Sequence, residues 1–163
     1  MTPDLYDRAQ ILISTYTERK LRIVAAESCT GGMIAALLTE IAGSSAVFER
    51  GFVTYSNDAK AELLGVDPAV IAAHGAVSEA VARAMAEGAL ARSHADVSVA
   101  VTGIAGPGGA TATKPVGLVH LAAAVRGGRT QHIERRYGDI GRAQVRASAV
   151  ADALSLLESC LVS

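Results

Sequence analysis

Apolar residues recur at helical spacing near the start of the chain. Thr2 followed by Pro3 is typical of a helix N-cap with proline in the first turn, and the apolar positions after it predict a helix that ends near Lys20. The short apolar run at 21–26 predicts a buried strand, and Gly31-Gly32 indicates a tight turn into a second helix. The apolar positions of the first helix are Leu5, Ala9, Leu12, Ile13 and Tyr16, and the second helix covers 33–41.

Predicted strands and helices continue to alternate through the middle of the chain. Residues 46–55 are rich in β-branched and aromatic side chains and predict a strand. Asn57 or Asp58 is suited to cap the helix that follows, which places Lys60 in the first turn of that helix. An alanine-rich helix is predicted over 78–93, where a serine followed by a glutamate begins it.

The last third of the chain predicts three more strands. Residues 95–101 predict a strand that leads into a glycine-rich loop. Residues 117–125 and 130–137 flank Gly127-Gly128, a two-residue signal for a hairpin with a primed turn and positive φ. Because a hairpin makes its two strands antiparallel, the sheet is expected to be mixed rather than purely parallel.

A final helix is predicted to begin at Asp139 or Gly141. Its apolar residues fall along one side, at Val145, Ala149, Leu154, Leu157 and Leu161. Helices that alternate with strands predict an α/β fold, a three-layer α/β/α arrangement around a mixed central sheet. The length of 163 residues, without an internal repeat or a low-complexity linker, predicts that residues 1–163 form a single domain.

Composition narrows the function classes. The net charge is −1 and the 15 Lys and Arg residues are scattered, so no basic stripe predicts nucleic-acid binding. Half of the residues are hydrophobic but only 4% are aromatic, which predicts closely packed helices with small contact residues. These alanine-rich helices are also suited to pack against a second subunit, so a homo-oligomer remains an open expectation.

The chain carries no signal for export or membrane insertion. The first residues lack the basic region and apolar run of a secretion signal, and no apolar run reaches the roughly 18 residues of a membrane span. The two cysteines, Cys29 and Cys160, form no CxxC motif. A cytoplasmic protein without a membrane partner is expected.

The first candidate for chemistry is the segment from Glu27 to Gly32. It places the Ser28 hydroxyl between a strand end and a helix start, where free backbone N–H groups point outward and can stabilise an oxyanion. Cys29, Thr30 and Gly31 belong to the same turn. The alternative interpretation is that Ser28 or Thr30 only caps the helix.

The second candidate is Lys60, which follows Tyr55 after the next predicted strand. If the two strands are neighbours in the sheet, the lysine can reach Ser28 and act as its base. Lysine does so only when neutral, so its pKa must fall well below about 10.4 through desolvation. The alternative is an ordinary solvated lysine, although a cation at a helix start opposes the helix dipole.

The third candidate is the glycine-rich loop that begins at Thr102. Its glycines let backbone amides approach an anion closely, which favours a phosphate site, although neither a Walker loop nor a GxGxxG motif is present. A flexible surface loop is the alternative. Lys114, Arg142 or Arg146 could add positive charge. The glycines of this loop are Gly103, Gly106, Gly108 and Gly109.

Other side chains compete for these roles. Cys29 stands beside Ser28 and is an alternative nucleophile, but a small buried thiol is the more ordinary role for it. The four histidines form neither an i,i+4 pair nor an HExxH motif, so no metal site is predicted. Glu27 has no second acid placed for glycosidase chemistry, and helix-terminus electrostatics is its alternative role.

Taken together, these motifs resemble the CinA carboxy-terminal domain family, the nicotinamide-nucleotide amidohydrolases. Four motifs occur in the family's order between Ile23 and Arg146, and the match is specific. The chain departs from the family at Ala110 and at Ala112-Thr113, which affects the loop conformation. The motifs are Ala26 to Gly32, Tyr55-Ser56-Asn57 with Lys60, His74 to Glu79, and Thr102 to Gly109 continuing through Lys114 to Gly117.

The resemblance implies hydrolysis of the carboxamide of nicotinamide mononucleotide to nicotinic acid mononucleotide and ammonia. It implies Ser28 as nucleophile, Lys60 as base, Tyr55 as a residue that orients or relays the proton, and Thr102 with the following glycines as the substrate loop. No metal or organic cofactor is required by this mechanism. A catalytically silent nucleotide-binding module and a Cys29-dependent amidase stay open as alternatives.

Overall fold

The computed structural model describes residues 1–162. It contains a five-stranded sheet, six α-helices and one short 3-10 helix in this described range. The helices are α1 (Pro3–Glu18), α2 (Met33–Glu40), η1 (Ser44–Ala46), α3 (Asn57–Leu64), α4 (Pro68–His74), α5 (Glu79–Ala91) and α6 (Arg142–Ser159). The strands are β1 (Ile23–Glu27), β2 (Phe48–Val53), β3 (Val97–Gly103), β4 (Leu118–Val125) and β5 (Thr130–Arg136).

The sheet is mixed, as the sequence predicts. Its strand order is β2-β1-β3-β4-β5. Strand β1, the second in this order, pairs in parallel with both β2 and β3, whereas β4 is antiparallel to β3 and to β5. After β1 the chain crosses to β2 on one side, and later returns to β3 on the other, so the strand order reverses at β1. In open α/β sheets, ligands bind outside the carboxyl ends of the strands at such a point.

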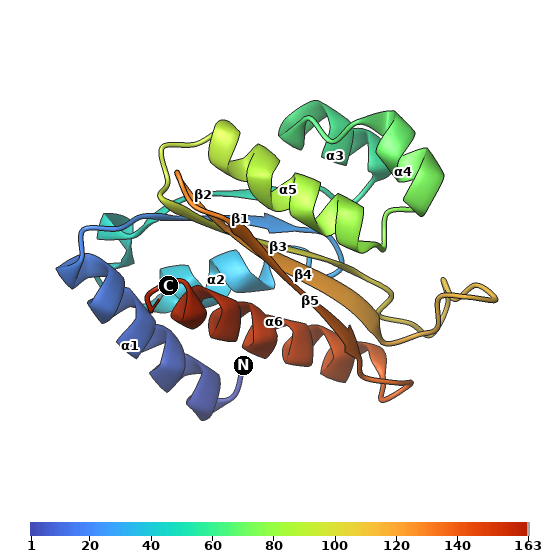
Figure 1. The fold of residues 1–163 in the computed structure, drawn as a ribbon. Coiled ribbons are helices and arrows are strands. Elements are labelled where there is room, and N and C mark those ends of the chain that lie inside the picture. Colours follow the sequence, from blue (N-terminus) through green and yellow to red (C-terminus); the bar gives the residue numbers. More distant parts are fainter. Residues whose placement is uncertain (163) are drawn as a thin grey trace.

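Helices cover both faces of the sheet, which confirms the three-layer α/β/α fold (Figure 1). Helices α1, α2 and α6 lie on one face, and α3, α4 and α5 lie on the other. Successive residues of a strand point to opposite faces. In β1, therefore, Ile23 and Ala25 join the core under α6, while Val24 and Ala26 join the core under α5.

Small residues let α5 pack closely. Its buried alanines face alanines of β1, β3 and β4 in one core cluster. Ser98 Oγ on β3 donates a 2.7 Å hydrogen bond to the Ala86 carbonyl, which satisfies a buried hydroxyl at this interface. A Cβ on Gly88 would lie 2.0 Å from the Leu64 carbonyl oxygen, so only glycine permits the approach of α5 to the end of α3. The expected close packing through small side chains is observed.

Two local predictions need correction, and one helix was missed. Ser56, rather than Asn57 or Asp58, caps α3, because its side chain accepts the Ala59 N–H at 3.0 Å. Helix α4, capped by Asp67, was not predicted. The hairpin turn is centred on Arg126-Gly127 and closed by the Gly128 N–H on the Val125 carbonyl, and Gly127 alone of the two glycines has positive φ, so the predicted primed turn at Gly127-Gly128 is wrong.

Candidate active site

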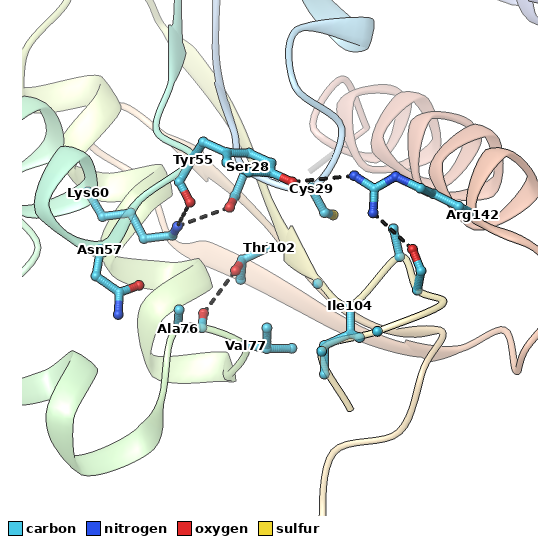
Figure 2. Close-up of a pocket in the computed structure, with 15 residues that line it drawn as sticks. Ser28, Cys29, Tyr55, Asn57, Lys60, Ala76, Val77, Thr102, Ile104 and Arg142 are labelled. Atoms are coloured by element: carbon cyan, nitrogen blue, oxygen red, sulfur yellow. Dashed lines mark hydrogen bonds between the residues drawn. The ribbon is translucent and has the colours of Figure 1, made fainter. Parts of the chain in front are cut away.

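The main candidate site is a pocket of about 250 Å³ at the carboxyl ends of the parallel strands. Three chain segments reach it just after β1, β2 and β3, and the start of α6 closes it from the side (Figure 2). Ten predicted site residues line it, namely Ser28, Cys29, Tyr55, Lys60, Thr102, Gly103, Gly106, Gly108, Gly109 and Arg142. Asn57, Ala76, Val77, Ile104 and Ala105 complete the lining.

The structure brings Ser28 and Lys60 together inside this pocket. Lys60 Nζ lies 3.0 Å from Ser28 Oγ, and the two residues are 1% and 8% exposed. The contact depends on the pairing of β1 with β2, which sets Ser28 beside the segment that leads into α3. Two main-chain carbonyls also contact the amine: Thr54 at 2.9 Å and Tyr55 at 3.4 Å.

The surroundings of Lys60 shift its protonation equilibrium toward the neutral form. No carboxylate pairs with this amine in the described range, and no Asp, Glu or His lines the pocket there. Burial lowers the pKa of Lys60 below its ordinary value, because the charged form loses its hydration. A neutral amine within hydrogen-bond distance of a hydroxyl can act as a general base toward it.

Glu27 holds the turn that carries Ser28. Its carboxylate is 1% exposed and accepts hydrogen bonds from Thr30 Oγ1 at 2.7 Å and from the Ile34 and Ala35 amides at 2.9 and 3.0 Å. The two amides belong to the first turn of α2, where an anion is stabilised by the helix dipole. Glu27 therefore serves the helix terminus, which is the alternative role that the sequence offered.

Only part of the predicted set of oxyanion donors is available. The Ser28 N–H donates to the Val101 carbonyl in the sheet, and the Gly31 N–H donates to the Ser28 carbonyl. The Cys29 and Thr30 amides donate to no other residue in the described range. Because Cys29 lines the pocket and Thr30 does not, the Cys29 amide is the better placed donor.

Two further predicted residues, Thr30 and Gly31, lie outside the pocket lining. The Thr30 hydroxyl is fully buried and bound to Glu27, and Gly31 supplies the positive φ of +57° that the turn into α2 requires. Both residues therefore shape the turn around Ser28 rather than line the cavity.

Tyr55 and Arg142 meet across the mouth of the pocket. One guanidinium nitrogen of Arg142 donates to Tyr55 Oη at 3.3 Å, and another donates to the Gly106 carbonyl at 2.9 Å (Figure 2). The Tyr55 hydroxyl has no hydrogen bond to Ser28 or Lys60, and the contact of this residue with Lys60 runs through its main-chain carbonyl. The predicted role of Tyr55 in orienting or relaying the proton is therefore not supported by a hydrogen bond from its hydroxyl to Ser28 or Lys60.

The glycine-rich loop lines the side of the pocket that faces Arg142. The amide N–H groups of Gly106, Gly108 and Gly109 bind no protein acceptor in the described range. Gly106 has φ of +81°, and a Cβ there would lie 2.6 Å from Val116 Cγ1. Thr102 closes the base of the loop, since its hydroxyl donates to the Ala76 carbonyl at 2.9 Å.

Lys114, Arg142 and Arg146 were the three side chains expected to bind an anion, and only Arg142 lines the pocket. Lys114 Nζ donates to the carbonyls of His74 and Val77 and so holds the segment before α5. Arg146 donates to the Cys29 and Thr30 carbonyls behind the Ser28 turn. Both side chains stabilise loops that build the site.

The other titratable groups lie apart from this arrangement or are inert. Burial raises the pKa of Cys29 to about 11, so its thiol stays protonated at neutral pH. His120 and His132 contact each other at 2.9 Å, and neither lines the pocket. Within residues 1–162, no group of three or more His, Cys, Asp or Glu side chains could hold a metal ion, and no helix is long and apolar enough to cross a membrane.

Sequence reasoning passed over the pocket role of Asn57. It lies three residues before Lys60 on α3, so the two side chains share one face of the helix. The sequence carried a signal for this position, because Asn57 stands with Lys60 in one family motif and lies one turn before it, but the role expected of Asn57 was to cap the helix.

Comparison with known proteins agrees with this geometry. The model of the CinA C-terminal domain matches residues 6–161. The chain belongs to this family. The CinA-like protein of Anaeromyxobacter dehalogenans is 51% identical over 152 residues, which are 93% of this chain and 36% of that protein. The CinA-like protein of Chlorobaculum tepidum is 60% identical over 110 residues, 68% of this chain and 26% of that protein.

Solved structures of CinA proteins share the whole fold. The competence/damage inducible protein CihA of Agrobacterium tumefaciens superposes with a TM-score of 0.97 at 54% identity, covering 100% of this chain and 98% of that one. A CinA superfamily protein of Klebsiella pneumoniae gives 0.92 at 34% identity, covering 97% and 98%. The aligned part of the chain corresponds to 26–37% of the length of the longer curated relatives.

Proposed function

We propose that this protein hydrolyses the carboxamide of nicotinamide mononucleotide, releasing ammonia and nicotinic acid mononucleotide. The observation that carries the proposal is the buried Lys60 amine, which lies 3.0 Å from the Ser28 hydroxyl with no carboxylate partner in the described range. Burial without a counter-ion shifts a lysine toward the neutral state, which is the state that a base requires.

The carbonyls around Lys60 support a specific orientation of its lone pair. A neutral amine has two N–H donors and one acceptor position. The Thr54 and Tyr55 carbonyls can take the two donors, at 2.9 and 3.4 Å. The third direction, toward Ser28, is then the lone pair. In this arrangement the Ser28 hydroxyl donates its hydrogen bond to Lys60, as the first proton transfer requires.

The proposed reaction proceeds through an acyl-enzyme. Ser28 Oγ bonds to the carboxamide carbon while its proton moves to Lys60, and the Cys29 amide stabilises the oxyanion. When the intermediate collapses, the C–N bond breaks and Lys60 returns the proton to the departing nitrogen, so ammonia leaves. Water then attacks the ester while its proton moves to Lys60. When the ester bond breaks, Lys60 returns this proton to Ser28 Oγ, so the hydroxyl and the neutral amine are both regenerated.

The opposite end of the pocket supports a phosphorylated substrate. The Arg142 guanidinium and the unused amides of the Gly106–Gly109 loop form a donor-rich wall suited to an anion. The family resemblance supplies the identity of the nucleotide. Free nicotinamide has the same amide but leaves this wall unpaired, so weak activity on nicotinamide is expected.

The sequence alternatives receive less support. A Cys29-dependent amidase needs a thiolate, whereas burial raises the thiol pKa to about 11 and no histidine lines the pocket in the described range. In a catalytically silent binding module, the buried contact between Ser28 and Lys60 would have no function.

The test compares deamidation of nicotinamide mononucleotide by the wild type and by Lys60→Arg. Arginine keeps a donor in place but does not lose its proton, so turnover should fall by about 10²–10⁴-fold. Lys20→Arg, on an exposed residue between α1 and β1, is the matched control and should retain wild-type turnover. Turnover by Lys60→Arg close to the wild-type value would contradict the assignment of the base. No ammonia release by the wild type would leave the silent binding module as the better account.

A further inference from the structure

Tyr55 connects the two ends of the pocket through different parts of one residue. Its main-chain carbonyl accepts from Lys60 Nζ at 3.4 Å, and its hydroxyl accepts from Arg142 at 3.3 Å. The ring therefore spans the interval between the Ser28–Lys60 contact and the Arg142 guanidinium. Figure 2 shows the side chain extending from the Lys60 side toward Arg142.

The ring is available to a ligand. Tyr55 is 64% exposed although it lines the pocket, which is unusual for a large aromatic side chain. The only hydrogen bond of its hydroxyl in the described range is the one to Arg142. The part of Tyr55 offered to a bound molecule is therefore the aromatic surface, not the hydroxyl.

The charge of the pocket defines what this surface can recognise. The described lining contains a guanidinium and a buried amine but no carboxylate. The substrate of the proposed function carries a positive charge on its pyridinium ring, which no anionic side chain in this lining can balance. The negative face of an aromatic ring attracts such a cation.

The ring also stands where the pyridinium must lie. A substrate with its carboxamide at Ser28 and its phosphate toward Arg142 must place the ring and sugar along the interval that Tyr55 spans. We infer that the Tyr55 ring binds the cationic pyridinium by a cation–π contact, so that this residue selects positively charged, N-substituted nicotinamides. The inference rests on the proposed function and assigns Tyr55 to substrate selection rather than to proton transfer.

This assignment adds a second basis for discrimination. Neutral nicotinamide lacks both the phosphate that Arg142 would bind and the ring charge that Tyr55 would bind. A positively charged nucleoside without phosphate keeps the second contact only. Affinity should therefore fall in two steps, from nucleotide to nucleoside and from nucleoside to the free base.

The test measures ligand binding rather than turnover. In a Ser28→Ala background, residue 55 is replaced by Phe and by phenylalanines with one, two and three ring fluorines, which progressively weaken the negative face. The affinity for nicotinamide mononucleotide is measured by calorimetry, and ribose 5-phosphate is the matched ligand because it lacks the pyridinium. Thermal unfolding of each variant checks that the fold is kept.

The expected result is a stepwise loss of nucleotide affinity, reaching about 5- to 30-fold from Phe to trifluoro-Phe, while ribose 5-phosphate binds equally throughout. An equal affinity across the series overturns the cation–π contact. A parallel loss for ribose 5-phosphate also overturns it, because the effect would then not involve the pyridinium.

Turnover separates this inference from the proton-relay alternative. In the otherwise wild-type protein, Tyr55→Phe should raise KM severalfold because Arg142 loses its hydrogen bond to the Tyr55 hydroxyl. Tyr55→Leu should raise KM further, and its effect on kcat should be smaller than its effect on KM. Tyr6→Leu, on an exposed tyrosine of α1 outside this pocket, is the control. A loss of about 10²-fold or more in kcat for Tyr55→Phe would make the hydroxyl a proton carrier and overturn the inference. Absence of ammonia release by the wild type refutes the proposed function, whereas active wild type with a flat fluorine series refutes only the inference.

Discussion

Replacing Glu27 by Gln should destabilise the protein and displace Ser28. The Glu27 carboxylate accepts three hydrogen bonds in a fully enclosed position, from Thr30 Oγ1, the Ile34 amide and the Ala35 amide. Glutamine keeps one acceptor oxygen but turns an NH₂ group toward one of these donors. The change therefore removes the negative charge at the start of α2 and leaves either the Ile34 or the Ala35 N–H without its acceptor.

The expected cost follows from these contacts. A hydrogen bond to a charged group contributes about 1.5–3 kcal/mol, and the helix-terminus charge about 0.3–1 kcal/mol more. The free energy of unfolding should therefore fall by about 2–4 kcal/mol. For a chain of this size, 1 kcal/mol corresponds to about 2–4 °C, so a loss near 3 kcal/mol lowers Tm by about 6–12 °C.

The assay is thermal unfolding followed by circular dichroism, together with turnover below the transition. Glu40→Gln is the matched control, because it makes the same change at the exposed opposite end of α2, where a negative charge gains nothing from the dipole. Its effect should stay within about 0.5 kcal/mol. A Glu27→Gln variant that melts with Glu40→Gln would refute the role of Glu27 as the anchor of the Ser28 turn.

Three further predictions concern the site. Only neutral Lys60 accepts the proton, and burial lowers its pKa, so kcat should rise with pH with a midpoint below the ordinary lysine pKa. A midpoint at or above the ordinary lysine pKa, in a pH profile at saturating substrate, would contradict this. Arg142→Met should raise KM for nicotinamide mononucleotide by about 10-fold or more and should affect KM for the riboside much less. Arg129→Met, at an exposed position, is the control. Equal effects on both substrates would contradict a phosphate-binding role for Arg142. Iodoacetamide should alkylate Cys29 slowly in the folded protein, because burial raises the pKa of this thiol to about 11. Peptide mass spectrometry should show faster alkylation after denaturation. Rapid alkylation of the folded protein would contradict a buried thiol.

The sequence predicted most of the fold because its signals are local. The apolar run before Ser28 and the glycines after it define β1, the turn and α2 without reference to the rest of the chain. The capping of α3 was mistaken because Ser56, Asn57 and Asp58 are all good N-cap residues, and only the traced hydrogen bond distinguishes them.

The hairpin turn could not be predicted from its two glycines. Arg126 enters the turn because distant groups hold it: its amide donates to the Asp96 carbonyl, and its guanidinium donates to the carbonyls of Ala95 and Leu90. These tertiary contacts override the local preference of Gly127-Gly128 for a primed turn.

The site could be predicted only as far as the strand order could be predicted. Ser28 and Lys60 are 32 residues apart, and their contact requires β1 and β2 to be neighbours, which the sequence only suggested. The choice among Lys114, Arg142 and Arg146 was not predictable, because it depends on which main-chain carbonyls each side chain meets.

The central claim is that Ser28 attacks the carboxamide of nicotinamide mononucleotide. The most direct measurement is ammonia and nicotinic acid mononucleotide formation by the wild type, Ser28→Ala and Cys29→Ala, each assayed with a metal chelator present. The account predicts equimolar products from the wild type, a loss of about 10²-fold or more in Ser28→Ala, and a much smaller loss in Cys29→Ala. Unchanged product formation by Ser28→Ala would contradict it.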